Sequence, residues 1–135
     1  MLRFILGVFV VLHGLVHLLY FGQSRRLFEL QSGMAWPDGS WAFARLLSAD
    51  AVRWLASAAC ILAAALFIGG GLGIFVRQAW WRPVIVTSAA FSAFLFLLFW
   101  NGGFQKLDNQ GGIGILINLA ILGAVLVLQW PQFEA

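Results

Sequence analysis

Apolar residues in this chain fall into four long runs, which are separated by shorter polar segments. The runs are apolar throughout and lack the alternation of polar and apolar residues that marks a spanning strand of a membrane barrel. A helix needs roughly 20 mostly apolar residues to cross the hydrocarbon core of a bilayer. The pattern therefore predicts an all-α integral membrane protein with four spans, at about residues 4–22, 53–76, 83–100 and 112–130.

The connections between the runs indicate how the spans are arranged. One longer connection follows the first span, and the other two are short. We therefore expect a single transmembrane domain over residues 1–135, folded as an antiparallel four-helix bundle. We expect the first span to persist as a helix. A cleaved signal peptide is disfavoured because no good small-x-small cleavage site follows it and histidine is unusual in such a segment.

The longer connection contains its own local signals. Trp36-Pro37-Asp38-Gly39 predicts a turn, and Ser40 can then cap a short helix from Trp41 to Leu47. The aromatic and leucine side chains of this segment predict a helix that lies in the membrane interface, between the first and second spans. Ser48 or Asp50 can cap the second span.

Composition narrows the class of protein further. Hydrophobic residues make up 62% of the chain and charged residues 10%, against about 45–50% and 25% in soluble domains. A soluble fold and a disordered chain are both excluded. The formal charge of +3 comes from basic residues that flank the spans, so nucleic acid is not an expected partner. These flanking charges are divided too evenly to fix the orientation in the membrane, and Cys60, the single cysteine, has no partner for an internal disulfide.

Two histidines interrupt the first span. His13 and His17 are four residues apart and therefore share one helical face, which Tyr20 continues. Numbering each span from its midpoint places His13 and Ser92 near the midplane of the membrane. The same numbering places three further residues roughly 5–8 Å towards the side of the longer connection, namely His17, Cys60 and Asn118.

Polar side chains that share one depth are expected to face one another, because a polar group exposed to lipid costs more than one that faces a neighbouring helix. We therefore predict a half-buried polar cluster and take it as the candidate ligand-binding site. Its members are His13, His17, Tyr20, Cys60, Ser92 and Asn118.

Three interpretations of the histidine pair are open at this point. The imidazoles can join helices by hydrogen bonds to Ser, Asn or backbone carbonyls. They can also bind the carbonyl or hydroxyl head of a quinone- or lipid-like molecule, because a neutral imidazole offers one donor and one acceptor. In the third interpretation His13 and His17 are metal ligands, or one of them is the axial ligand of a haem or a chlorophyll-type tetrapyrrole. A metal needs more ligands than this pair supplies.

Charged residues are missing from the interior of all four spans. Ion-coupled transporters place ionisable groups at the midplane of the membrane, so a charged translocation path within one chain is disfavoured. A catalytic histidine needs an orienting carboxylate or its equivalent, and none lies in a span. The sequence therefore favours a non-enzymatic role and identifies no catalytic residue.

Leu12-His13-Gly14-Leu15-Val16-His17-Leu18-Leu19 resembles the first helix of small bacterial four-helix membrane proteins of the DoxX-like group. Asn101-Gly102-Gly103-Phe104 is similar to the Gly-Gly-Phe that opens their last helix. This group includes a small membrane subunit associated with quinone-linked sulfur oxidation. The resemblance implies a multi-pass protein of the bacterial inner membrane with a redox-associated or hydrophobic-ligand role.

The expected function is auxiliary. We predict a small membrane protein that binds a quinone- or lipid-like ligand near the His13 and His17 pair. The alternative is a non-catalytic structural subunit of a larger membrane complex, and a self-assembling pore is disfavoured by the dry interior. The lipid bilayer is the expected surrounding, and a homo-oligomer or a larger complex is the expected assembly, because four short helices bury little surface.

Overall fold

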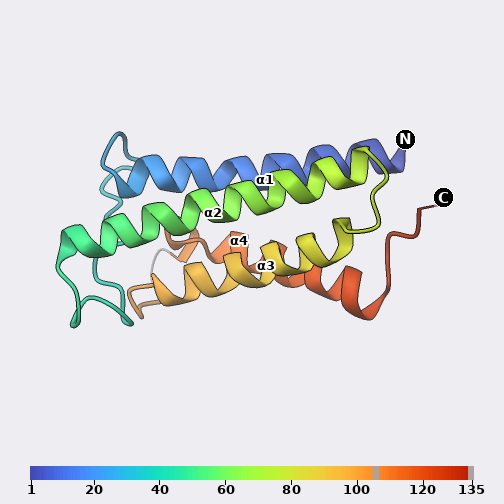
Figure 1. Ribbon diagram of the computed structural model, residues 1–135. Coiled ribbons are helices and arrows are strands. Elements are labelled where there is room, and N and C mark those ends of the chain that lie inside the picture. Colours follow the sequence, from blue (N-terminus) through green and yellow to red (C-terminus); the bar gives the residue numbers. More distant parts are fainter. Residues whose placement is uncertain (105–106, 134–135) are drawn as a thin grey trace.

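The computed structural model describes residues 1–104 and 107–133, and these residues form helices joined by turns (Figure 1). The described residues contain no strand. The elements are α1 (Leu2–Ser24), α2 (Ala49–Phe75), α3 (Trp81–Leu98), a short 3₁₀ helix η1 (Leu107–Gln110), α4 (Gly112–Leu122) and a π-helical segment η2 (Gly123–Val127) that continues α4.

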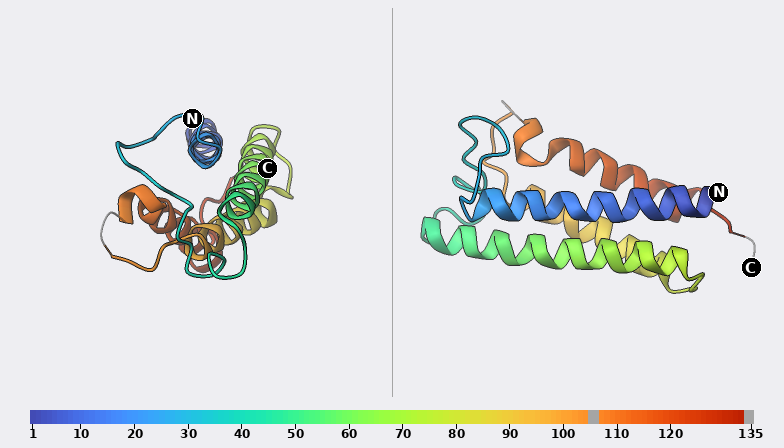
Figure 2. Two further views of the ribbon diagram at one scale, coloured as in Figure 1. Left: turned by 90° about the vertical axis from the view of Figure 1, so that its left-hand side faces the viewer. Right: turned by 90° about the horizontal axis from the view of Figure 1, so that it is seen from above.

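Consecutive helices lie side by side and run in alternating directions (Figures 1 and 2). α1 packs mainly on α2, α2 on α3, and α3 on α4. The start of α1 therefore lies at the same end as the last turns of α4 and η2, and we call this the terminal end. Residues 25–48 lie at the opposite end, which we call the connection end.

Three of the helices are long and apolar enough to cross a membrane. α1, α2 and α3 have 23, 27 and 18 residues, and each exposes large apolar side chains on its outer face. Lipid is the solvent that accommodates such surfaces, because a soluble protein rarely exposes large contiguous apolar patches. The multi-pass membrane character expected from the hydrophobic pattern is therefore supported by the fold.

The fourth predicted span, residues 112–130, is shorter than expected. The helix begins at Gly112 as predicted, directly after Gly111 with its left-handed φ of 84°, but it already ends in the π-helical segment at Val127. Gln129 then takes a left-handed φ of 52°. Hydropathy alone does not reveal these backbone endings, and the resulting apolar helix falls below the length of the other three.

The connection between α1 and α2 differs in part from its prediction. Residues 36–39 form the predicted turn, and the side chain of Ser48 accepts a hydrogen bond from Ala51 N at 3.2 Å, so Ser48 caps α2. The expected interfacial helix from Trp41 to Leu47 is a series of turns. The indole Nε1 of Trp41 donates to the carbonyl of Leu97 near the end of α3, and its backbone N donates to the carbonyl of Trp100 just beyond that helix. These tertiary bonds divert the backbone of a segment that is too short to hold a helix alone.

Glycines let α1 and α2 approach closely. A Cβ added at Gly14 would lie 2.7 Å from Cβ of Phe67 and 3.2 Å from the carbonyl oxygen of Ala64. A Cβ at Gly71 would lie 2.5 Å from a methyl group of Val11. Small residues at such crossings allow the backbone contact that drives helix association in lipid.

We predict that Gly14→Ala destabilises the protein by about 1–3 kcal/mol, as overpacking does in tight cores. The control is Gly69→Ala, because an added Cβ there has no atom within 4 Å. Thermal unfolding in mild detergent should show a lower midpoint for Gly14→Ala and an unchanged or higher midpoint for Gly69→Ala. Equal midpoints for the two variants would refute close packing at Gly14.

Candidate functional site

Polar side chains from three helices meet in the middle of the fold. His13 and His17 come from α1, Ser92 from α3 and Asn118 from α4. They are buried, with exposed fractions of 8%, 1%, 0% and 0%. We call these four residues the polar lock. The predicted convergence of His13, His17, Ser92 and Asn118 is thus observed.

Hydrogen bonds join the lock into one closed chain. Nε2 of His13 lies 2.8 Å from Oδ1 of Asn118, and Nδ2 of Asn118 donates to Oγ of Ser92 at 2.8 Å. The same Oγ lies 2.6 Å from Nε2 of His17. Nδ1 of His17 lies 3.1 Å from the backbone carbonyl oxygen of His13, which returns the chain to its start.

The order of donors and acceptors assigns the tautomers. The carbonyl of His13 only accepts, so Nδ1 of His17 carries a proton and Nε2 of His17 accepts from the Ser92 hydroxyl. Ser92 Oγ accepts from the amide of Asn118, whose Oδ1 accepts from Nε2–H of His13. Two neutral imidazoles therefore satisfy the chain, as expected for hydrogen bonding between helices, the first of the three interpretations.

Aromatic rings enclose the lock. Phe67 of α2 lies edge-on to His13, with centroids 4.8 Å apart, and stacks on His17 at 5.4 Å. Phe9 stacks on His13 from the side of the terminal end, and Phe96 lies 5.7 Å from His17. All four helices therefore contribute to this region, α2 through an apolar ring.

Two other predicted site residues lie outside the hydrogen-bonded chain described above. Cys60 is fully buried in an apolar cluster with Val52, Ala56 and Leu95. Cys60 was predicted to join the cluster because of its depth in the membrane. Depth alone does not tell which neighbouring side chains a residue contacts. Tyr20 lies one turn beyond His17, and its ring packs edge-on against Trp36 at 5.1 Å and Phe96 at 4.8 Å.

Metal ligation gains no support from the lock. Among the residues that the structure describes, no group of three His, Cys, Asp or Glu side chains is placed to hold a metal ion. Nε2 of His13 and both ring nitrogens of His17 face protein partners at hydrogen-bond distance. A metal or a tetrapyrrole at His17 would have to displace one of these partners.

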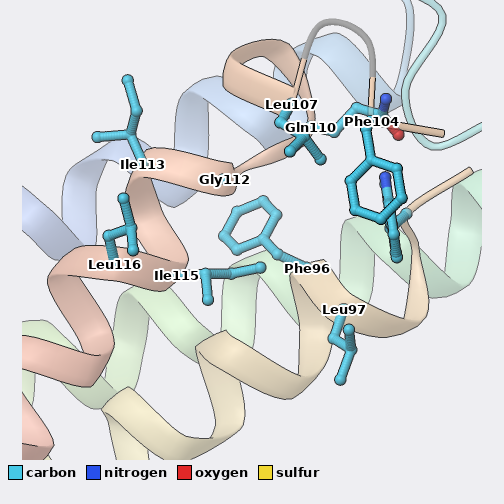
Figure 3. A pocket seen from close by; sticks show the side chains of 10 residues that line it. Phe96, Leu97, Phe104, Leu107, Gln110, Gly112, Ile113, Ile115 and Leu116 are labelled. Atoms are coloured by element: carbon cyan, nitrogen blue, oxygen red, sulfur yellow. The ribbon is translucent and has the colours of Figure 1, made fainter. Parts of the chain in front are cut away.

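An apolar cleft of about 390 Å³ lies between the end of α3 and the start of α4 (Figure 3). Phe96 projects from α3 towards Gly112 and Ile115, and Phe104 stands at the edge. Phe96 also contacts His17. This cleft therefore lies on the connection-end side of the lock.

A second cleft, of about 360 Å³, lies on the terminal-end side of the lock. All four helices line it, whereas only α3, α4 and the segment between them line the first. Along α4, Asn118 lies close to the point where the residues that line the first cleft end and those that line the second begin. The lining side chains of the second cleft are apolar, namely Leu6, Phe9, Val10, Ile74, Trp81, Ile85, Ile117, Ala120, Ile121, Ala124, Val125, Trp130 and Pro131.

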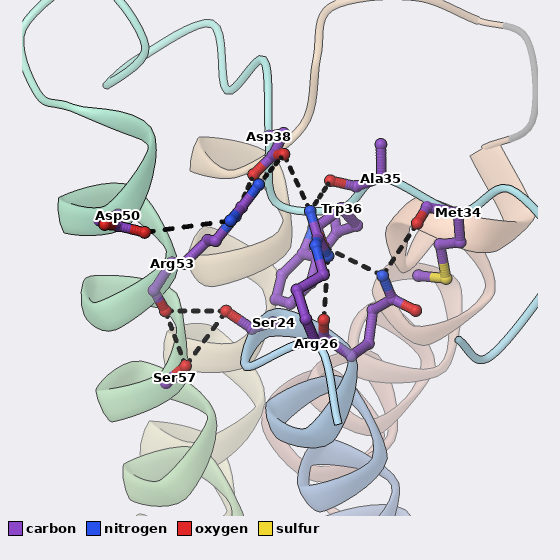
Figure 4. A network of polar contacts seen from close by, with 10 residues as sticks. Ser24, Arg26, Met34, Ala35, Trp36, Asp38, Asp50, Arg53 and Ser57 are labelled. Atoms are coloured by element: carbon purple, nitrogen blue, oxygen red, sulfur yellow. Dashed lines mark hydrogen bonds and ion pairs between the residues drawn. The ribbon is translucent and has the colours of Figure 1, made fainter. Parts of the chain in front are cut away.

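A charged cluster fixes the connection end (Figure 4). Asp38 accepts from Arg53 at 2.7 and 2.9 Å and pairs with Arg26 at 2.9 Å. The Arg53 hydrogen bond, together with the charges of both arginines, holds the pKa of Asp38 below its usual range. Arg26 also donates to the carbonyls of Gln23, Ala35 and Trp36.

This charged cluster was not predicted from the sequence. The Trp36–Gly39 turn placed Asp38 between the first two spans, but its partners lie 12 and 15 residues away and become neighbours only in the fold. The sequence signalled these partners of Asp38 only through Arg25-Arg26 at the end of the first span and Arg53 at the start of the second. Gln23 was also missed. It is fully buried, and its amide donates to Met34 O while its Oε1 accepts from Leu30 N.

We predict that Ser92→Ala and Asn118→Ala each weaken the protein, because each leaves buried partners without a hydrogen bond. Interhelical hydrogen bonds in membranes contribute about 0.6–2 kcal/mol. The control is Thr87→Ala, an exposed hydroxyl on the same helix as Ser92. Unfolding in detergent should also give a coupling between His17→Ala and Ser92→Ala in a double-mutant cycle. Additive effects would contradict the lock.

We predict that acid weakens the connection end. Because the folded-state pKa of Asp38 is depressed below 3.8, its contribution to stability is complete above that value and is lost as pH falls through the lower folded pKa. Asp38→Asn should remove this dependence and cost up to about 1 kcal/mol near neutral pH, since the pair is partly screened by solvent. Asp50→Asn is the control, because Asp50 is 90% exposed. Equal acid sensitivity of the wild type and Asp38→Asn would contradict this role.

Comparison with protein-family models, with curated proteins and with solved structures gives no match for this chain. The DoxX-like resemblance therefore stays a prediction. Function must be inferred from the polar lock and from the two clefts that flank it.

Proposed function

We propose that this chain is an integral membrane protein, an antiparallel four-helix bundle of the bacterial inner membrane, that binds a quinone- or lipid-like molecule in the cleft on the terminal-end side of the polar lock. The observation that carries the proposal is the cleft itself. Its volume of about 360 Å³ lies within the usual range of small-molecule sites. Its apolar side chains favour a ligand that is mainly hydrocarbon.

The lock gives the histidine pair a part in this function without direct coordination of the ligand. Phe9 lines the cleft and stacks on His13, while Ile117 lines it beside Asn118. The His13–Asn118 hydrogen bond joins α1 to α4, which form two of the walls of the cleft. The histidine pair therefore keeps the cleft open at a fixed width. The ligand binds near the pair and not directly to it, which refines the expectation from the sequence.

A structural role in a larger membrane assembly is the second candidate, and the length of α4 favours it. α4 with η2 is too short to count among the candidate spans. A short hydrophobic segment is accommodated by local thinning of the bilayer or by association with other helices. Packing of α4 against a second copy or a partner subunit would satisfy this requirement.

Filling the cleft tests the proposal. Trp81 and Trp130 line the cleft, so a quinone bound there should quench their fluorescence. We predict saturable quenching of the wild type by decylubiquinone in mild detergent and at least a tenfold weaker response in Ala120→Phe, whose new ring occupies the cleft.

The matched control is Leu119→Phe, because Leu119 is exposed and does not line either cleft. It should bind as the wild type does. Identical titrations of wild type and Ala120→Phe, with both variants folded by circular dichroism, would exclude this cleft as the site. Binding retained by Ala120→Phe but lost on filling the other cleft with Leu116→Trp would move the site to the connection end.

A further inference from the structure

Two arginines and two aromatic rings border the terminal end of the proposed binding cleft. The guanidinium of Arg82 lies 4.8 Å from the ring of Trp81, and that of Arg3 lies 4.4 Å from the ring of Phe133. The rings of Trp81 and Phe133 contact each other at 5.6 Å. We call Arg3, Trp81, Arg82 and Phe133 the basic rim.

The basic rim is continuous with the cleft. Trp81 itself lines the cleft, and Nη1 of Arg3 donates at 3.1 Å to the carbonyl of Ile74, another lining residue. Nη2 of Arg82 donates to the carbonyl of Pro131, which closes the cleft at this end. Both guanidinium groups therefore lie at the border between the hydrocarbon-lined space and the surface.

Arg82 has hydrogen-bonding capacity left over. Its Nη1 is buried and has no hydrogen-bond partner among the residues that the structure describes. A buried donor without a partner is destabilising, and more so when the group is charged. An acceptor that joins Arg82 on binding would recover this cost.

The charges around the basic rim favour an anion. Arg3, Arg77 and Arg82 lie at the terminal end, whereas Glu29, Asp38 and Asp50, the acidic residues whose side chains are described, belong to the connection end. α3 also begins at Trp81, so the partial positive charge of its first turn points to the same place. Guanidinium groups bind carboxylate and phosphate oxygens by paired, charge-assisted hydrogen bonds.

We propose that the ligand of this cleft is an anionic amphiphile, whose carboxylate or phosphate headgroup binds Arg82 and Arg3 while its hydrocarbon chain lies between α1 and α4. This proposal rests on the function proposed above and specifies its ligand class. A free fatty acid and an acidic phospholipid share this chemistry.

The experiment compares two probes with the same chain and different heads. Dibromostearic acid and dibromostearyl alcohol both quench tryptophan on contact, and Trp81 and Trp130 report binding in the cleft. At a pH where the free acid is ionised, the wild type should bind the acid at least tenfold more tightly than the alcohol. Arg82→Gln should lose this preference and keep its binding of the alcohol, while Arg82→Lys should retain part of it.

The matched control is Arg77→Gln, which removes an exposed arginine from the turn between α2 and α3 at the same end. It should keep the preference of the wild type. Equal affinity of the wild type for acid and alcohol, or an unchanged preference in folded Arg82→Gln, would overturn the headgroup proposal alone. Failure of both probes to respond to Ala120→Phe would instead overturn the cleft as the binding site.

Bilayers of brominated lipid distinguish the two sources of the anion, an acidic phospholipid and a free fatty acid. Stronger quenching by brominated phosphatidylglycerol than by brominated phosphatidylcholine, lost in Arg82→Gln, supports a phospholipid headgroup. A preference for the acid in detergent, without a preference between the two phospholipids, supports a single-chain carboxylate. No charge preference in either system contradicts the proposal.

Discussion

The hydrogen bond between His13 and Asn118 joins α1 to α4, the first and last helices of the fold. The helix pairs with extensive packing, α1 with α2, α2 with α3 and α3 with α4, are each consecutive in the chain. In lipid, apolar surfaces gain little from meeting each other, so hydrogen bonds and close packing decide which helices associate. Ser92 and His17 complete the same chain of bonds, and Phe67 seals it from α2. One buried cluster thus ties all four helices together at one depth.

This arrangement explains why two clefts exist and why they differ. The lock holds α4 at Asn118, and on either side of that point the large side chains leave space unfilled. One cleft lies at the connection end, where the charged cluster around Asp38 has its arginines already paired. The other ends at the basic rim, where Arg82 has a buried donor to offer. The contrast between the arginines paired with Asp38 and the buried Nη1 of Arg82, which has no hydrogen-bond partner among the described residues, gives the second cleft its proposed preference for an anionic headgroup.

Much of the core could be predicted from sequence, because a membrane reduces the problem to spans, depth and helical faces. The four-residue spacing of His13 and His17 and the depths of Ser92 and Asn118 were sufficient to predict that these residues meet. Depth could not predict the surroundings of Cys60, which lies at the right level among apolar neighbours. The early end of α4 depends on a π-helical segment and on the left-handed Gln129, neither of which changes hydropathy. The clefts and the Arg82 geometry depend on side-chain packing between distant segments, so no local pattern signals them.

The most direct test of this account is an experimental structure of the wild-type protein crystallised in a lipidic phase that contains a long-chain carboxylic acid. The account predicts elongated density between α1 and α4 beside Phe9 and Ile121, with the headgroup at Arg82 and the His13–Asn118 hydrogen bond intact. α1 packed directly against α4 along the whole cleft, or an imidazole of the pair turned away from Asn118 and Ser92 towards lipid, would contradict it.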